Sequence, residues 1–386
     1  LGVQIFDFEP ADPSQVGQGI RTFAEEGFDL VIGVGFANEP AITATAKEFP
    51  NVKFAVIDAV PGEGQLPNAL GVVFREHEGS FLVGYVAGKL SRTGVVGFIG
   101  GMDIPLIHKF EAGFRAGAEY AFQEDGIQGR VLVGYVGNTP AAWNDPAKAK
   151  EIASSQARQG ADIIYAAAGG SGLGLIDFVK EEMCLREGGA VRFVREDRFA
   201  DVPKYPAYEE KCGEGTTPLF FIGVDANQNY LHPGKVLTSM LKRVDVAVFE
   251  TIKAVVDGDT AGGIKVFDLS VDGGIGLTRP AAGNGPTTLE ESAQNGADVF
   301  ITGNAFFRSG DYAAFVQKAR PLLQPRPRPP NRLLNTVTAP SIIVVKSAQF
   351  AGEDGPHWVT RARYFAAAVL VAHRLEPKYC TQYVQV

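Results

Sequence analysis

Two aspartates and a glycine-rich turn supply polar groups that the sequence places directly after apolar, strand-like runs. Asp103 and Asp225 each follow such a run, and the glycine-rich turn at 169–174 follows a third. Carboxylates at strand ends can accept hydrogen bonds from ligand hydroxyl groups, and glycines let backbone amides approach a ligand closely. Asp103 could also cap the helix that follows it, and Asp225 could bond a neighbouring loop instead of a ligand.

Aromatic, amide and basic side chains extend this candidate site. Phe36, Trp143 and Asn144 fall in loops at predicted strand ends or at a predicted hinge, where a ring could stack on a planar ligand with about 1–3 kcal/mol. A single aromatic residue is more often part of a core, and Lys242 could equally face solvent. The full set of candidate ligand-binding residues is Phe36, Asp103, Trp143, Asn144, Gly170, Gly172, Asp225 and Lys242.

The elements that must position these residues follow a repeating pattern. From Gln4 to about Gly276 the chain alternates short apolar runs, turns and amphipathic stretches, which predicts parallel α/β units. The apolar residues of each run are nearly continuous, as expected when helices cover both faces of a sheet. The predicted strands are 30–35, 53–58, 70–74, 95–100, 130–136, 162–167 and 219–224. The predicted helices are 15–26, 39–49, 80–91, 106–123, 145–159 and 174–180.

Composition excludes several classes of protein. The 386 residues are 45% hydrophobic, which is enough for a substantial core in two or three folded units. The net charge of -8 is spread along the chain and argues against nucleic acid as a partner. The turn at 169–174 lacks the lysine of a P-loop, which argues against nucleoside triphosphates. The sequence predicts no catalytic residue, no metal site and no cofactor.

The cysteines and the first residues bear on the cellular compartment. Three cysteines without C-x-x-C spacing indicate neither a zinc knuckle nor a redox pair. Cys184 and Cys212 could pair in an oxidising compartment, but two free thiols are the preferred interpretation. The opening residues Leu1 to Phe6 are typical of a strand interior rather than a signal peptide, and no apolar run is long enough to cross a bilayer. Any export signal or lipid-bearing cysteine is therefore expected upstream.

Two strings carry a resemblance to a known family. The segments VVGFIGGMDIP at 95–105 and KFEAGFRAG at 109–117 are similar to the signature of the basic membrane protein family, whose characterised members include purine nucleoside receptors. The resemblance covers about residues 1–265, apart from an insertion at 181–217. It implies an α/β protein of the type I periplasmic-binding-protein fold, with two doubly wound parallel-sheet lobes, a hinge and a ligand in the cleft between the lobes.

This resemblance sets expectations for domains and partners. Lobe 1 is expected at 1–103 plus 232–260, and lobe 2 at 104–231. Relatives begin with a strand and a loop that supplies base contacts, and this chain starts after them, so the first lobe is expected to lack that strand and to bind nucleosides weakly or not at all. The implied partners are a purine nucleoside and an ABC permease, and the implied location is outside the cytoplasm. Membrane contact is expected only through a lipid anchor that this chain does not contain.

The last third of the chain carries a second resemblance. Residues 270–320 are similar to the final βα units of ribulose-phosphate 3-epimerases, which would make Asp272 catalytic and Gly274, Gly303 and Asn304 phosphate contacts. The earlier metal-binding histidine motifs of a complete barrel are absent.

The remaining residues leave one further class of protein open. A Pro- and Arg-rich linker is predicted at 321–340, followed by a tail at 341–386 with a strand at 341–346 and a helix at 358–373. The ligand-sensing half of a transcription regulator remains a third alternative, although the first residues contain no helix-turn-helix.

Overall fold

The computed structural model describes residues 1–9, 13–197, 206–232, 235–259, 261–270, 274–278 and 341–347. These residues form two compact units. Unit 1 comprises Leu1–Phe74 and Arg243–Gly274 together with the strand at 341–347, and unit 2 comprises Arg75–Lys242 and the strand that begins at Ile275. The chain therefore leaves unit 1 after Phe74, not after residue 103, and returns after Lys242, not after residue 231.

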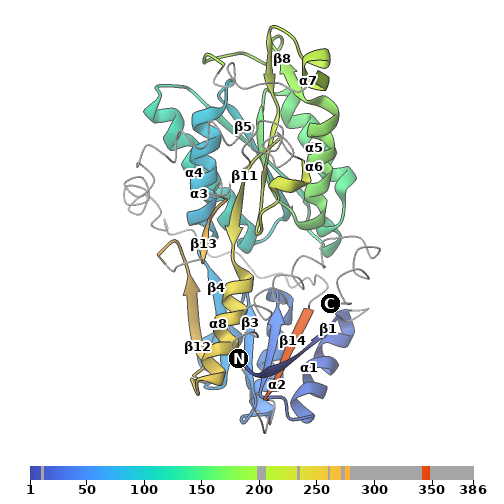
Figure 1. Ribbon diagram of the computed structural model, residues 1–386, viewed down its shortest axis with the longest axis vertical. Helices are drawn as coiled ribbons and strands as arrows, with labels where there is room; N and C mark the ends of the chain where they lie inside the picture. Colours follow the sequence, from blue (N-terminus) through green and yellow to red (C-terminus); the bar gives the residue numbers. More distant parts are fainter. Residues whose placement is uncertain are drawn as a thin grey trace. The chain divides into compact units, whose positions relative to one another are not determined.

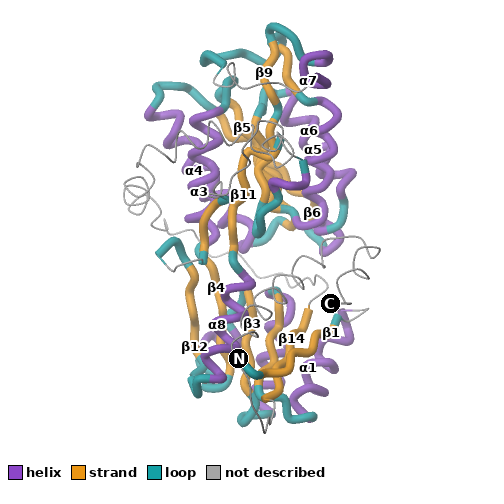
Figure 2. Tube along the Cα trace, viewed as in Figure 1, coloured by secondary structure: helices purple, strands orange, loops and turns teal. Residues whose placement is uncertain are grey.

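Unit 1 is built on a six-stranded sheet in the order β1-β14-β2-β3-β4-β12 (Figure 2). Its strands are β1 (Val3–Phe8), β2 (Leu30–Val34), β3 (Lys53–Ile57), β4 (Ala69–Phe74), β12 (Gly263–Phe267) and β14 (Ser341–Ser347). Its helices are α1 (Val16–Glu25), α2 (Glu39–Glu48) and α8 (Val244–Val256). The apolar face of α1, with Ile20 fully buried, packs with α2 and the sheet into one core.

A strand from the tail lies inside this sheet. The strand predicted at 341–346 is confirmed as β14, which pairs antiparallel with both β1 and β2. In its register Val344 stands between Phe6 and Val31. The position between β1 and β2 is therefore taken by residues more than 300 positions away along the chain.

Unit 2 is built on a second six-stranded sheet in the order β13-β11-β10-β7-β5-β6. Its strands are β5 (Val95–Met102), β6 (Arg130–Gly137), β7 (Ile163–Ala167), β10 (Phe220–Gly223), β11 (Val236–Lys242) and β13 (Ile275–Leu277). Its helices are α3 (Glu76–Leu90), α4 (Pro105–Glu124), α5 (Pro146–Arg158) and α6 (Gly172–Glu182). All strands are parallel except β13, and Figure 1 shows α3 and α4 on one face and α5 and α6 on the other.

Glycines allow α3 and α4 to pack with their backbones in contact. A Cβ atom added at Gly84 would lie 2.1 Å from the carbonyl oxygen of Phe114, and one added at Gly117 would lie 2.0 Å from that of Phe81. Real Cβ atoms do not approach a backbone oxygen so closely, so both positions require glycine. Part of the string 109–117 that carries the family resemblance is thus explained by helix packing and not by ligand contact.

The chain crosses between the units after Phe74 and after Lys242, and both crossings have the same local geometry. Arg75 and Arg243 are the first residues after each crossing, with φ/ψ of -92°/66° and -83°/68°, and each directly precedes a helix. Each arginine pairs with a carboxylate in the first turn of that helix, Arg75 with Glu78 at 3.3 Å and Arg243 with Asp245 at 2.7 Å. The crossings therefore use one irregular residue each, close to the inverse γ-turn conformation.

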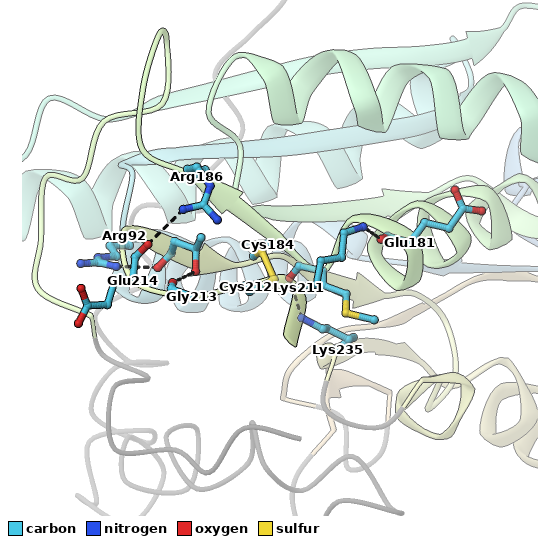
Figure 3. Close-up of a disulfide and its surroundings, with 11 residues drawn as sticks. Arg92, Glu181, Cys184, Arg186, Lys211, Cys212, Gly213, Glu214 and Lys235 are labelled. Carbon is cyan, nitrogen blue, oxygen red and sulfur yellow. Dashed lines mark hydrogen bonds between the residues drawn. A yellow bond between two sulfur atoms is a disulfide. The ribbon is translucent and has the colours of Figure 1, made fainter. Parts of the chain in front are cut away.

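The insertion at 181–217 is closed by a disulfide (Figure 3). Cys184 and Cys212 are bonded, with their Cα atoms 6.2 Å apart, so the preferred interpretation as free thiols is wrong. The reason is that β8 (Cys184–Arg186) pairs antiparallel with β9 (Thr216–Pro218), which returns the chain beside Cys184. The short helix α7 (Pro206–Lys211) ends one residue before Cys212.

Arginines anchor the rest of the insertion to α3 and α4. The buried Arg195 side chain pairs with Asp125 at 2.8 Å and donates a hydrogen bond to the Gly88 carbonyl oxygen at 2.7 Å. The guanidinium of Arg92 lies 3.9 Å from the centre of the Phe193 ring. An Arg at the carboxyl end of a helix is favourable because the last carbonyl groups carry partial negative charge.

The chain from β12 (Gly263–Phe267) to β13 (Ile275–Leu277), which enters the segment that resembles an epimerase, pairs with both sheets. β12 pairs parallel with β4 in unit 1, and β13 pairs antiparallel with β11 in unit 2. Gly274 accepts a backbone hydrogen bond from Arg243 at 3.0 Å, as part of this pairing. Asp272, Gly303 and Asn304 lie outside the described residues, as do the predicted linker at 321–340 and the predicted helix at 358–373.

Candidate functional site

The carboxyl ends of five parallel strands collect most of the predicted site at one edge of the unit 2 sheet. β6, β5, β7, β10 and β11 run in the same direction, so the residues after them share that edge. All predicted site residues except Phe36 lie there, namely Asp103, Trp143, Asn144, Gly170, Gly172, Asp225 and Lys242. The structure thus brings together, within one unit, residues from 103 to 242.

Lys242 is buried and does not face solvent. Its side chain is 5% exposed, and its Nζ atom lies 3.2 Å from Oε1 of Glu76, which is 0% exposed. Lys109 approaches the other carboxylate oxygen of Glu76, also at 3.2 Å. Glu76 was not among the predicted site residues. Its position at the start of a helix directly after a predicted strand was the signal that could have identified it, because a helix N-terminus favours a carboxylate.

The Glu76–Lys242 pair is incompletely hydrogen-bonded. Oε1 of Glu76 is buried and accepts no hydrogen bond from the described residues, although Lys242 is within ion-pair distance. Burying two charges costs several kcal/mol unless hydrogen bonds satisfy them, so such a pair is weak evidence for stability. Buried charges of this kind are found preferentially where a protein binds or converts a ligand.

A buried tyrosine, Tyr165, interacts electrostatically with Glu76 of this pair. The Tyr165 hydroxyl group is 3.4 Å from Ser80 Oγ. Burial, together with the negative charges of Asp225 and Glu76, raises the pKa of Tyr165 well above its ordinary value. The phenol therefore stays neutral at all physiological pH values and keeps a proton that it can donate.

Asp225 stands on a strained but well-supported turn. Its φ of 63° lies in the left-handed region, which Asp tolerates better than most residues. Its backbone oxygen accepts a hydrogen bond from the Lys242 amide at 2.8 Å, which fixes the two residues side by side. The following loop is held by Gln228, whose Oε1 accepts from the Val224 amide at 2.9 Å. Such strain persists only where the surroundings enforce it, and it is common at binding sites.

Trp143 follows β6, and its ring packs against β5 and against the turn after β7. A Cβ added at Gly101 would meet the indole ring at 2.4 Å, and one added at Gly169 would meet it at 3.5 Å. Gly169 also has a positive φ of 55°. The indole Nε1 is buried without a hydrogen-bond partner among the described residues. The glycine-rich turn therefore leaves space for this ring. The indole is half-buried, so only its uncovered side is accessible to a ligand.

The neighbours of Trp143 are less buried. Asn144 is exposed and Gly170 lies beside it, with an added Cβ 3.4 Å from Asn144 Oδ1. Gly172 is buried at the start of α6. Asp145 caps α5 by accepting from the Lys148 amide at 2.9 Å, which confirms the predicted helix start.

Asp103 is exposed and binds a histidine instead of capping a helix. Its Oδ1 atom lies 2.6 Å from Nε2 of His108, and its side chain is 56% exposed. The N-cap residue of α4 is Ile104, and it makes no side-chain capping bond. The suggested capping role is therefore wrong, and the carboxylate keeps an oxygen available at the strand edge.

Phe36 belongs to unit 1. It begins a short 3-10 helix, η2 (Phe36–Asn38), directly after β2, so it lies at the carboxyl edge of the unit 1 sheet. Asp58 follows β3 at the same edge, with a φ of 70°. The Phe36 side chain is half-buried. This edge therefore also carries an aromatic ring and a carboxylate.

The described residues contain no group of three or more side chains placed to hold a metal ion. Within the same part of the chain, no helix combines the length and apolar character needed to span a bilayer.

Two relatives of known sequence match this chain over most of its length. Over 279 residues the chain is 31% identical to basic membrane protein D of Borreliella burgdorferi (strain JD1), a match that covers 72% of this chain and 70% of the relative. It is also 30% identical over 277 residues to an uncharacterized lipoprotein of Pyrococcus horikoshii, covering 71% of this chain and 60% of that protein.

Solved structures agree with the fold. An ABC transporter solute-binding protein from Aeropyrum pernix K1 is 27% identical with a TM-score of 0.60, covering 81% of this chain and 80% of the other. A transcriptional activator of the comK gene from Bacillus halodurans shares the fold at 19% identity and a TM-score of 0.51, covering 75% of this chain and 83% of the other. The fold alone therefore does not separate transporters from regulators.

The family model decides between them. The model for PnrA-like ABC transporter substrate-binding proteins matches residues 14–299. This range includes β12 and β13 and extends past residue 265, where the resemblance was expected to stop, so these strands are part of the binding-protein fold. The chain belongs to the family of PnrA-like ABC transporter substrate-binding proteins.

Proposed function

We propose that this protein binds a purine nucleoside at the carboxyl edge of the unit 2 sheet. The observation that carries the proposal is the buried Glu76–Lys242 pair beside Asp225. The site holds carboxylates together with an ammonium group, which favours an uncharged polar guest over an anion or a cation.

The side chains match the parts of a nucleoside. The Asp225 carboxylate accepts hydrogen bonds from paired ribose hydroxyl groups, and the ammonium group of Lys242 donates one. Trp143 supplies a ring for stacking on the base, and Asp103 or Asn144 binds the polar edge of the base. Lys242 exchanges part of its interaction with Glu76 for the ligand, which is possible because Glu76 also has Lys109 at 3.2 Å.

The partner and location follow from the same proposal. A binding protein of this family delivers its ligand to an ABC permease, so we place the protein outside the cytoplasm, held at the membrane by a lipid anchor. The Cys184–Cys212 disulfide supports this location, because disulfides persist in oxidising compartments.

A thermal-shift screen followed by calorimetry tests the proposal. Inosine, guanosine and adenosine are compared with ribose and with the free bases, because a ligand that binds only the folded state raises the melting temperature. We expect nucleosides to give the largest shifts, with dissociation constants weaker than micromolar. Asp225→Asn and Lys242→Met should each remove the shift, whereas Asp177→Asn, on the exposed side of α6, should not. No shift with any nucleoside at millimolar concentration, or equal shifts with ribose alone, would contradict the proposal.

A further inference from the structure

Unit 1 contains a cavity of about 240 Å³ far from its carboxyl edge. The cavity lies between α8 and the amino ends of β2, β3 and β4, and Asp259, Ala261 and Gly262 contribute to its lining. Its lining includes Leu30, Lys53, Leu70, Val255, Asp259 and Lys265. It shares no residue with the nucleoside site proposed above.

Sheet register places two lysines on the same face of the sheet as this cavity. Lys53 and Ala55 face one side of β3, and Ala55 pairs with Leu70 of β4. Leu70 and Val72 face the same side of β4, and Val72 pairs with Lys265 of β12. Side chains alternate along a strand, so both lysines share the face of Leu70, a wall of the cavity.

Neither lysine is neutralised. In the described part of the chain no carboxylate lies within ion-pair distance of Lys53 or Lys265, although most other half-buried cations of the protein have one. The Lys265 ammonium group lies 5.3 Å from the Phe267 ring. Asp259, on the cavity rim, instead accepts from the Ala261 amide at 3.3 Å. The cavity therefore has two positive charges and one negative charge, a net charge that matches a monoanion.

The remaining walls are apolar. Leu30, Leu70, Ala254 and Val255 line the interior. The volume is slightly below the lower limit of about 300 Å³ for clefts that hold drug-sized ligands, so the guest must be small. The polar Asn68 does not offer its amide nitrogen, because that atom already donates to the carbonyl oxygens of Ala46, Phe49 and Val52.

We propose that this cavity is a second binding site, which takes a short aliphatic carboxylate. The carboxylate lies between the ammonium groups of Lys53 and Lys265, and the alkyl chain lies against Leu30 and Leu70. Charge-assisted hydrogen bonds from two lysines supply the affinity, and the apolar walls select for a chain over a bare ion.

Calorimetry and amide NMR of the full chain test this site. The probes are sodium butanoate and sodium hexanoate, compared with hexan-1-ol and inorganic phosphate at equal ionic strength. Hexanoate is expected to bind most tightly and to shift amide signals of Thr251, Ala254 and Gly262. Lys53→Met and Lys265→Met should each weaken hexanoate binding at least tenfold, whereas Lys47→Met, on the exposed side of α2, should leave it unchanged.

Three outcomes would overturn the proposal. Hexan-1-ol binding as tightly as hexanoate would show that the lysines contribute nothing, and phosphate binding as tightly would show that the apolar walls contribute nothing. Unchanged hexanoate affinity in both methionine variants would place the ligand elsewhere. The nucleoside screen on the same variants separates the two sites, because a loss of carboxylate binding should leave nucleoside-induced melting shifts intact.

Discussion

Both units are built on a six-stranded sheet, and each of these sheets includes one antiparallel strand among otherwise parallel strands. In unit 2 that strand is β13, at the edge, where it pairs only with β11. In unit 1 it is β14, in the interior, with β1 on one side and β2 on the other. Removing an edge strand shortens a sheet, whereas removing an interior strand divides it. Unit 1 therefore depends on a distant segment in a way that unit 2 does not.

Unit 2 has its own long-range closure, which is covalent. The disulfide joins residues that are 28 positions apart and ties the end of α6 to the insertion. The long-range closure of unit 1 thus consists of backbone hydrogen bonds, whereas that of unit 2 is a covalent bond. Hydrogen exchange read by mass spectrometry can follow each unit separately, because peptides from the two units differ.

The largest expected effect is the loss of the disulfide. Replacing both Cys184 and Cys212 by serine should lower the free energy of unfolding by about 3–4 kcal/mol, from the entropy of a loop of this length. Faster exchange should appear in unit 2 peptides, first around β8 and β9. Mild reduction of the unchanged protein should reproduce the effect. Equal acceleration in unit 1 would contradict the idea that the closures are separate.

A proline in β14 tests the closure of unit 1. Val344→Pro removes a backbone donor in an interior strand and should cost about 3 kcal/mol, because a buried ladder partner loses its bond. Exchange should accelerate in β1 and β2. Val344→Thr keeps the donor and the branched side chain and is the matched control. Equal stability of the proline and threonine variants would show that β14 is dispensable.

Two glycine-to-alanine changes sharpen the comparison of helix packing. Gly117→Ala in α4 meets the Phe81 carbonyl oxygen and should destabilise unit 2 by about 2 kcal/mol. Gly17→Ala in α1 of unit 1 has open space around it and should stabilise by about 0.5–1 kcal/mol. Chemical denaturation of both variants measures the difference, and effects of the same sign would contradict the packing described for α3 and α4.

The remaining expected effect is a pH dependence from two titratable groups of unit 2. Burial raises the pKa of Asp162 from 3.8 to about 6. The folded state then binds more protons than the unfolded state between about pH 4 and 6, so the contribution of Asp162 to stability falls as pH rises through this window. Asp162→Asn should therefore gain stability relative to the unchanged protein as pH rises from 4 to 6.

His232 acts in the opposite direction over nearly the same window. Burial, together with the positive charges of Lys180 and Lys235, lowers its pKa from 6.5 to about 4. The folded state binds fewer protons there, so stability falls as pH drops from 6.5 to 4. His232→Gln should gain relative stability on acidification. Parallel pH titrations of the two variants that slope in the same direction would refute this assignment.

The sequence predicted well wherever an element and its neighbours are close in the chain. The strands 95–100, 130–136 and 162–167 correspond to β5, β6 and β7, because continuous apolar runs between turns indicate buried parallel strands. The placement of Asp103 and Asp225 at strand ends followed from the same rule. Strand β11 and helix α8 were not among the predicted elements, although Lys242 was singled out.

Features that depend on distant pairing were not predictable. Nothing in residues 341–346 indicates which sheet they enter, and the disulfide depends on the β8–β9 pairing, which the turn-rich insertion conceals. The lobe boundaries were misplaced because strand β5 contains the family signature and was assigned to the preceding lobe. Glu76 was missed because a charged residue at a helix start is ordinarily solvated, and only tertiary packing makes it buried.

The matched arginines at the crossings limit where the backbone can adjust. Arg75 directly follows β4 and precedes α3, and Arg243 directly follows β11 and precedes α8, so every neighbouring peptide group is already committed to a ladder or a helical turn. Twisting ψ at these two residues alone leaves those hydrogen bonds intact. Gly274, at the third passage, has no side chain to resist the same rotation. At the crossings after Phe74 and after Lys242, a single residue thus separates a strand of one unit from a helix of the next.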